Sequence, residues 1–271
     1  EIFFLFFIFG VILFLNVFNN LFKFIYYLHY CKIKSCPAGT HIGCGKNGVK
    51  SCSKGSQKVP FSKNLVDIAV NEHNKKRNDV AGGNVPGYAA AARMATMQWD
   101  AELAKIACFN VYRCVYGHDQ CRNTETYSYS GQNLYMYQIS RPIKSAEVPS
   151  LVKDGIQAWF DEHNNSILVR PYYTSIYWKY SYLFLFSCSD IGHFTVMVAD
   201  KNVKLGCCAE ISPPDSKRPT WNNFLMACNY ATTNIYDRPI YKRGNGPASG
   251  CKSKNKQFPN LCAVGETYPQ I

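Results

Sequence analysis

One stretch decides the fold class, the sequence GHFTVMVADKNVKLGCCAE at positions 192–210. In it an apolar run, Phe194–Val198, is followed by a polar turn at 199–202 and by a second apolar run, Val203–Glu210. Two such runs joined by a short polar turn predict a β-hairpin. A third run, Phe224–Tyr230, predicts another strand, so an antiparallel sheet is expected in this part of the chain.

Three segments before this stretch show helical periodicity. The first starts after Ser62 and runs through about Arg77. The second starts after Asp100, and the third covers about Ser150–His163. Apolar side chains recur every three or four residues in each of them. Ser and Asp are residue types that cap helix N-termini, and the glycines of 81–87 predict a loop. Helices packed on an antiparallel sheet define an α+β domain.

The chain has thirteen cysteines, at irregular spacings and without the paired C-x2-C knuckles of a zinc ribbon. This pattern predicts a disulfide framework formed in an oxidising compartment, and therefore a secreted, extracellular protein. An odd number leaves at least one cysteine free or in an intermolecular bridge. Residues 30–60 are rich in Cys, Gly, Lys and Ser, and we expect them to form a disulfide-stapled, largely irregular arm.

The first 28 residues are almost entirely apolar. Their composition predicts an export signal, with a retained membrane anchor as the alternative, and no stable membrane span is expected once a signal is removed. Residues 172–188 are unusually aromatic, with Tyr, Trp and Phe on both faces of any strand they could form. We interpret this atypical insert as translated intron rather than as a ligand surface.

The formal net charge is +12, and the basic residues are scattered along the sequence. Nucleic-acid binding is not expected, because it needs Lys and Arg gathered on one face. Anionic surfaces or lipids are more compatible partners than nucleic acids. The lysines and glycines of 242–258 are interpreted as a solvated part of a C-terminal tail, residues 243–271.

Seven short motifs follow one another between residues 72 and 230. They are Glu72–Arg77, Gln98–Ala104, Gly117–Arg122, Gly131–Leu134, Trp159–Glu162, Gly192–Thr195 with Gly206–Cys207, and Cys228–Tyr230. In this order the chain resembles the CAP superfamily (SCP/TAPS), and specifically its venom allergen 5 (antigen 5) members from arthropods. The resemblance implies a three-layer α-β-α sandwich over 61–242, with its antiparallel sheet between helical layers, preceded by the arm.

The resemblance also implies a disulfide pattern. It pairs Cys31 with Cys44, Cys36 with Cys121, Cys52 with Cys114, and Cys207 with Cys228, and a loop Cys251–Cys262 is expected in the tail. Three cysteines remain. Cys108 is expected as a small core residue, Cys188 lies in the aromatic insert, and Cys208 is an alternative to Cys207 as the partner of Cys228.

Members of the family carry two histidines and two glutamates in a central cleft, where some bind a divalent metal. The matching positions here are His118, His193, Glu162 and Gln132. Gln132 stands where the family pattern has a carboxylate, and a neutral amide is a poor ligand for a first-row metal. We therefore expect at most a weakly bound Zn²⁺ on His118 and His193, and the alternative is a hydrogen-bonded cleft without an ion.

Four other histidines receive simpler interpretations. His73 is expected to fix local packing, and His163 to place a favourable charge at a helix end. His29 and His41 have no partner that the sequence identifies.

The family resemblance and the motifs predict a protein that is not an enzyme and requires no cofactor. The chain contains neither the G-x-S-x-G elbow nor the H-E-x-x-H pair of common hydrolases. The expected partner is a small hydrophobic ligand (a sterol, a lipid or an amphipathic mediator) or an extracellular protein. A metal-dependent or Ser/His hydrolase in the cleft is the alternative.

Overall fold

The computed structural model describes residues 29–45, 52–165, 191–214, 219–235 and 238–269. The apolar segment 1–28 and the aromatic insert at 172–188, with Cys188, lie outside these residues. Within them, no helix has the length and apolar character needed to cross a bilayer.

The centre of the fold is a sheet in the order β1-β4-β5-β3. These strands are β1 (Gln57–Pro60), β4 (Lys204–Ser212), β5 (Asn222–Tyr230) and β3 (Gly131–Ile139), and all three pairings are antiparallel. A short strand, β2 (Gln98–Trp99), pairs in parallel with β4. The hairpin is therefore formed by β4 and β5, with Cys207 directly opposite Cys228.

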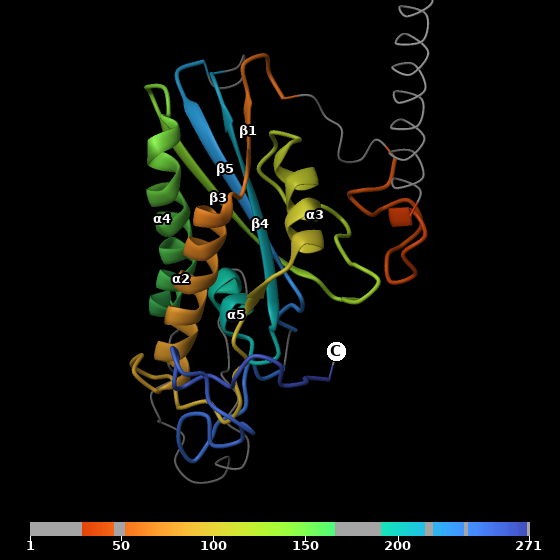
Figure 1. The fold of residues 1–271 in the computed structure, drawn as a ribbon. Coiled ribbons are helices and arrows are strands. Elements are labelled where there is room, and N and C mark those ends of the chain that lie inside the picture. The colour runs from red at the N-terminus through yellow and green to blue at the C-terminus, as the bar shows by residue number, and fades with distance from the viewer. Residues whose placement is uncertain (1–28, 46–51, 166–190, 215–218, 236–237, 270–271) are drawn as a thin grey trace, which may run out of the picture.

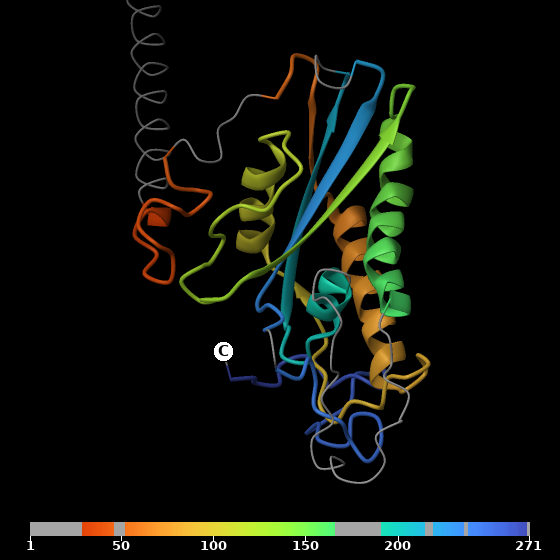
Figure 2. The ribbon, with the colours of Figure 1, turned by 180° about the vertical axis from the view of Figure 1, so that it is seen from behind.

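Helices cover both faces of this sheet, as Figures 1 and 2 show. They are α2 (Lys63–Ala81), α3 (Ala101–Val111), α4 (Val148–Asp161) and α5 (Gly192–Val198), with 3-10 turns at Ser145–Glu147 and Glu162–Asn165. One face carries α3, and the other carries α2, α4 and α5 (Figure 1). The predicted α-β-α sandwich is thus confirmed.

The N-terminus of α3 forms as its sequence predicts. The side chain of Asp100 accepts hydrogen bonds from the backbone N–H groups of Glu102 and Leu103, both at 2.9 Å. This satisfies two amides that have no partner inside the helix. At the end of α2 the prediction was too short, because the helix continues to Ala81 before the chain turns at Gly82 and Gly83.

The expected strand Phe194–Val198 is wrong, because these residues belong to α5. Both ends of this short helix are held by distant side chains. The Glu162 carboxylate accepts from the N–H groups of His193 and Phe194. The Arg77 guanidinium donates to the carbonyls of Met197 and Ala199. Residues 194–198 are buried on every side, so their apolar run shows no period that distinguishes a helix from a strand.

Three strands, β1, β2 and β3, were not expected. The first four residues of β3 are buried on both faces, which removes the alternation of a half-buried strand. The arm is also less irregular than predicted, because its last residues form β1 and pair with β4 from Gln57↔Ile211 to Pro60↔Cys208.

Six disulfides are present among the described residues. Five are the bridges that the resemblance implies, Cys31–Cys44, Cys36–Cys121, Cys52–Cys114, Cys207–Cys228 and Cys251–Cys262. The sixth, Cys108–Cys208, corrects the expectations for both of its cysteines. Neighbouring residues of a strand point to opposite faces. Cys207 therefore packs in the core under α2 and α4, whereas Cys208 faces Ala107 and Val111 of α3.

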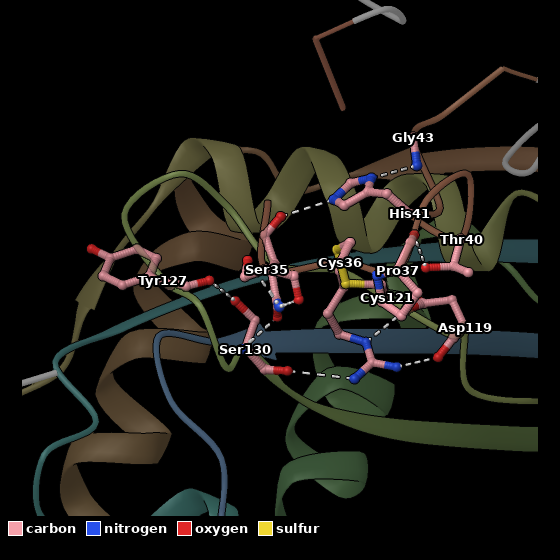
Figure 3. Close-up of a disulfide and its surroundings, with 12 residues drawn as sticks. Ser35, Cys36, Pro37, Thr40, His41, Gly43, Asp119, Cys121, Tyr127 and Ser130 are labelled. Atoms are coloured by element: carbon pink, nitrogen blue, oxygen red, sulfur yellow. Dashed lines mark hydrogen bonds and ion pairs between the residues drawn. A yellow bond between two sulfur atoms is a disulfide. The ribbon is translucent and has the colours of Figure 1, made fainter. Parts of the chain in front are cut away.

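The arm is attached to the outer side of α3. Its side chains Tyr30, Ile33 and Ile42 pack against Ile106, and Cys36–Cys121 fixes the arm to the loop after α3 (Figure 3). His41, for which the sequence identified no partner, is buried here. Its Nδ1 accepts from the N–H of Gly43 at 2.9 Å, and its Nε2 contacts the Asn123 carbonyl at 2.8 Å.

Residues 242–258 are largely exposed to solvent, as predicted, but the C-terminal segment is also anchored on the domain. Phe258, Leu261 and Cys262 are buried. The N–H of Asn260 donates to the side-chain oxygen of Asn78 at the end of α2. Figure 1 shows this segment lying across the lower end of α2.

Candidate functional site

His118 and Gln132 form the first half of the candidate site. His118 lies in the loop after α3, and Gln132 is the second residue of β3. The Nδ1 of His118 is 2.8 Å from Oε1 of Gln132. Burial lowers the pKa of His118, while the hydrogen bond to Gln132 opposes this shift.

The surroundings of Gln132 determine which atoms face His118. Its Nε2 donates to the Asp119 carboxylate and to the side-chain oxygen of Asn229, both at 2.9 Å. Both are acceptors, so the amide nitrogen must lie on their side and the amide oxygen on the side of His118. His118 therefore donates from Nδ1, and in the neutral imidazole Nε2 is left as the lone-pair nitrogen.

Asp119 is the centre of this network, and the sequence analysis did not assign it a role. Its buried carboxylate accepts from the Arg122 guanidinium at 2.7 Å and from the Asn110 side chain at 2.7 Å, besides Gln132. Gln132 is uncharged, whereas the family pattern has a carboxylate at this position. Asp119 carries a negative charge one hydrogen bond away from Gln132, and Arg122 compensates this charge. The adjacent His-Asp pair at 118–119 is the sequence signal that could have identified it.

Glu162 and His193 form the second half of the site. The Oε1 atom of Glu162 is 2.5 Å from Nδ1 of His193. Its Oε2 accepts from the backbone N–H groups of His193 and Phe194 at 2.9 and 3.1 Å. The Glu162 carboxylate thus serves as the N-terminal cap of α5. It also fixes the orientation of the His193 imidazole through Nδ1, the same ring atom that His118 uses to bond Gln132. The ring of His193 also stacks on Trp159, with ring centres 6.2 Å apart.

A buried network of hydrogen bonds connects His73, Tyr230 and Asn133 to the backbone carbonyl of His193. Nδ1 of His73 contacts the Ala69 carbonyl at 2.7 Å and must donate to it, so Nε2 accepts from the Tyr230 hydroxyl at 2.8 Å. Asn133 donates to the same hydroxyl and to the carbonyl of His193. Burial lowers the pKa of His73 to about 4, which keeps the ring neutral. His73 therefore has the packing role that was predicted for it.

His163 is also at the helix end where the sequence placed it. Its Nδ1 contacts the Phe160 carbonyl at 2.7 Å, and its ring lies among those of Tyr88, Phe160 and Phe194. His29 lies 3.7 Å from the Glu125 carboxylate on the surface of the arm.

Two of the four side chains keep a ring nitrogen that could bind a metal. Both side-chain oxygens of Glu162 and Oε1 of Gln132 are occupied by hydrogen bonds, which leaves the Nε2 atoms of His118 and His193 as ligands. In the described part of the chain, the groups of three or more metal-ligating side chains within 4.8 Å are Cys52, Cys114 and Glu210, and Cys251, Cys262 and Glu266. Their cysteines are bridged, and a disulfide supplies no thiolate.

The chain is similar to known proteins in sequence and in fold. The family model "Cysteine-rich secretory protein family" (CAP) matches residues 70–230. The chain is 33% identical over 246 residues to venom allergen-1 of Aedes albopictus, covering 89% of each protein. It is 34% identical over 225 residues to venom allergen 5.02 of Vespa crabro, covering 79% of this chain and 99% of that one.

A solved structure has the same fold. The crystal structure of NaASP2 with Zn²⁺ aligns with 79% of this chain and all of that chain, at a TM-score of 0.56 and 25% identity. Two kinds of comparison, by sequence and by structure, thus agree with the resemblance carried by the motifs. The chain belongs to the cysteine-rich secretory protein (CAP) family and is of the venom allergen 5, antigen 5-like type.

Proposed function

We propose that the protein is secreted and acts by binding a small hydrophobic or amphipathic ligand (a sterol, a lipid or an amphipathic mediator) without turning it over. One observation carries the proposal. Four aromatic rings gather where α2, α4 and α5 meet, those of Tyr88, Phe160, His163 and Phe194, with ring centres 4.9 to 6.4 Å apart. Phe160 and His163 are only half-buried, so the cluster reaches the surface.

A cation lies at the edge of this aromatic cluster. The Nζ atom of Lys76 is 4.9 Å from the centre of the Phe160 ring, and it donates to the Gln157 side chain. Its pKa is lowered by burial, although the nearby Glu72 and Asp161 oppose that shift. An apolar surface with a few placed polar groups is typical of sites for small amphipathic molecules. The lysine favours a ligand with an acidic head.

The histidine site supports binding rather than catalysis. Acyl transfer needs a nucleophile held against a base. Among the described residues, the side chains bonded to the His118 and His193 rings are Gln132 and Glu162, neither of which is a hydroxyl or thiol. The Thr195 hydroxyl, near His193 in sequence, donates to backbone carbonyls. Gln132 also removes a carboxylate that a hydrolase could use as a base.

We further propose that the cleft holds Zn²⁺ only weakly. His118 and His193 would be the ligands, through Nε2, and the metal would supply Lewis acidity. The hydrogen bonds of Glu162 and Gln132 would orient the two rings.

A binding assay tests the ligand proposal. Radiolabelled cholesterol and a fluorescent fatty acid are titrated against the natural protein and the Phe160→Ala variant. We expect the variant to lose about tenfold in affinity for at least one probe, about 1.4 kcal/mol. Phe61→Ala is the matched control, because Phe61 is also a partly buried ring but stacks on Trp99, far along the chain from the cluster. An equal loss in both variants, or no binding of either probe, would contradict the proposal.

The hydrolase alternative is tested in parallel. Peptide and ester hydrolysis are measured for the natural protein and for a variant with His118, Glu162 and His193 replaced by Ala. A catalytic base contributes on the order of 10²–10⁴ in rate. Turnover above the blank that disappears in the triple variant would establish an enzyme, whereas we expect none in either protein.

A further inference from the structure

The C-terminal segment carries a group of exposed basic side chains, which we call the C-terminal basic surface. Its members are Lys242, Arg243, Lys252, Lys254 and Lys256. Residues 242–271 contain a single acidic residue, Glu266. The net charge of +12 is therefore partly concentrated in a segment that takes no part in the histidine site or the aromatic cluster.

These side chains are presented by a rigid backbone. Cys251–Cys262 closes the loop that carries the three lysines, and Phe258 and Leu261 anchor it in the core. Inside the loop, the N–H of Asn255 donates to the Leu261 carbonyl at 2.9 Å. A charged segment that is already ordered loses little conformational entropy when a partner binds. The lysines are therefore exposed to solvent, as the composition indicated, but they lie on an ordered loop.

The two halves of the surface lie close together. The N–H of Ala92 donates to the carbonyl of Lys242, and the carbonyl of Ala92 accepts from the N–H of Gly250. The segments that begin at Lys242 and Gly250 thus flank the same residue. A single extended partner can contact both.

The acidic residue does not neutralise this surface. The Glu266 carboxylate accepts from the Arg93 guanidinium at 3.1 Å and from the N–H of Ser253 at 3.1 Å. Its charge is therefore compensated within the domain by Arg93. In the part of the chain that the structure describes, none of the five basic side chains forms an ion pair with a carboxylate.

We propose that the C-terminal basic surface binds a sulfated polysaccharide. Basic clusters of this size are typical of sites for polyanions such as heparin or nucleic acid. Disulfides place the protein in an oxidising compartment, where sulfated polysaccharides are the abundant polyanions. A bilayer site would need apolar side chains to enter the lipid, and among the described residues of this segment Val264 is the one large apolar side chain that is exposed.

Single-stranded nucleic acid is also a poorer fit. Its bases need exposed aromatic rings to stack on. The exposed aromatic side chains among the described residues are Tyr116, Tyr129 and Trp221, all on other loops. The ring of Tyr268, in the tail itself, is covered by Arg93 at 4.2 Å.

The test uses heparin as the probe and the full-length secreted protein. Binding is measured by calorimetry at about 0.15 M salt and by the salt concentration that elutes the protein from immobilised heparin. The Lys252→Gln/Lys254→Gln/Lys256→Gln variant should bind at least about tenfold more weakly and elute at lower salt, because fewer counterions are displaced. Lys-to-Arg substitution at the same positions should restore the affinity.

A charge-matched control separates this surface from net charge. Lys54, Lys63 and Lys153 are also exposed, but lie on a loop before β1, on α2 and on α4. Their triple substitution by Gln should change heparin affinity by less than about threefold. An equal loss in both variants would overturn the proposal. So would a failure of the natural protein to bind heparin, or tighter binding to phosphatidylserine vesicles or to single-stranded DNA. Circular dichroism and unchanged unfolding midpoints verify that the variants fold.

Discussion

Arg77 of α2 donates a hydrogen bond of 2.7 Å to the carbonyl of Met197, in the last turn of α5. The same fully buried guanidinium donates to the carbonyls of Ala199 and Ala95. The Arg77 side chain therefore supplies donors for carbonyls at the C-terminal end of α5. These hydrogen bonds fix the position of the helix that carries His193. Burial lowers the pKa of Arg77 to about 10, so the group remains charged at neutral pH.

Replacing Arg77 by Met should lower the free energy of unfolding by about 3 kcal/mol or more. The substitution leaves several buried carbonyls without a donor, and each costs roughly 1–3 kcal/mol. Urea unfolding followed by circular dichroism measures the change. Arg141→Met is the control, because Arg141 is exposed and bonds to Glu147 and to the neighbouring Pro142 carbonyl, so the substitution should cost under about 1 kcal/mol. A loss at Arg77 no larger than that at Arg141 would refute this role.

Stability should decrease as the pH falls from about 6.5 to about 4, through His73. Its pKa is about 4 in the folded protein, against 6.5 for a histidine that is fully exposed to solvent. The unfolded chain thus binds a proton over this range and the folded one does not, so acid favours unfolding. The full effect is about 3 kcal/mol, since each pKa unit corresponds to about 1.4 kcal/mol.

Unfolding free energies measured from pH 7 to 4 test this prediction. The His73→Gln variant, although less stable overall, should show a shallower decrease over the same range. His41 adds to the slope with the same sign, because burial also lowers its pKa, so His41→Gln should flatten the curve further. A profile that His73→Gln leaves unchanged would exclude His73 as the titrating group.

Non-reducing peptide mapping should recover Cys108 joined to Cys208, beside Cys36–Cys121 and Cys52–Cys114. The Cys108→Ala/Cys208→Ala variant should lose about 2–4 kcal/mol of stability, because the bridge closes a long loop between α3 and β4. The Cys251→Ala/Cys262→Ala variant removes a bridge of sequence separation 11 instead of 100 and should lose less. Recovery of Cys208 joined to Cys228 would show that the pairing in the structure is wrong.

Local signals in the sequence predicted the parts of the fold that depend on local chemistry. Asp100 has the side chain that caps a helix, and it does so. The apolar stripes of α2 and α4 follow helical spacing because one side of each helix packs on the core and the other faces solvent, whereas α3 is also covered by the arm on its outer side. The Cys207–Cys228 bridge was implied by the family resemblance, and the antiparallel register of β4 and β5 places the two cysteines opposite each other.

Features that depend on distant contacts could not be predicted in this way. The α5 helix exists because Glu162 and Arg77, far from it in the sequence, occupy its two ends. The partner of Cys208 follows from the face of β4 on which it lies, and that face is known only once the strand register is known. The role of Asp119 similarly requires Gln132 and Asn110 to be brought beside it by the sheet and α3.

The last prediction concerns Gln132 and the proposed zinc site. Zn²⁺ should bind the natural protein weakly, because the two imidazoles are the only proposed ligands and Gln132, beside His118, contributes no charge. In Gln132→Glu a carboxylate replaces the amide next to His118, and Zn²⁺ affinity should rise about tenfold, or about 1.4 kcal/mol.

The same substitution should destabilise the metal-free protein. Gln132 donates to Asp119 at 2.9 Å, and a glutamate there would place two carboxylates in contact. Like charges at this distance disfavour joint ionisation. We expect a loss of about 1–2 kcal/mol at pH 7, the scale of one unsatisfied buried acceptor. The loss should become smaller as the pH is lowered, because protonation of one of the two carboxyl groups relieves the repulsion.

Calorimetry with Zn²⁺ and urea unfolding without metal measure the two effects. Gln138→Glu is the control, because Gln138 lies on the same strand but is exposed and bonds to Asn223 instead. It should leave both quantities nearly unchanged. Tight zinc binding by the natural protein that Gln132→Glu does not alter would show that the ion is held elsewhere. A fully stable Gln132→Glu protein would show that Asp119 does not interact with this position as the hydrogen bonds indicate.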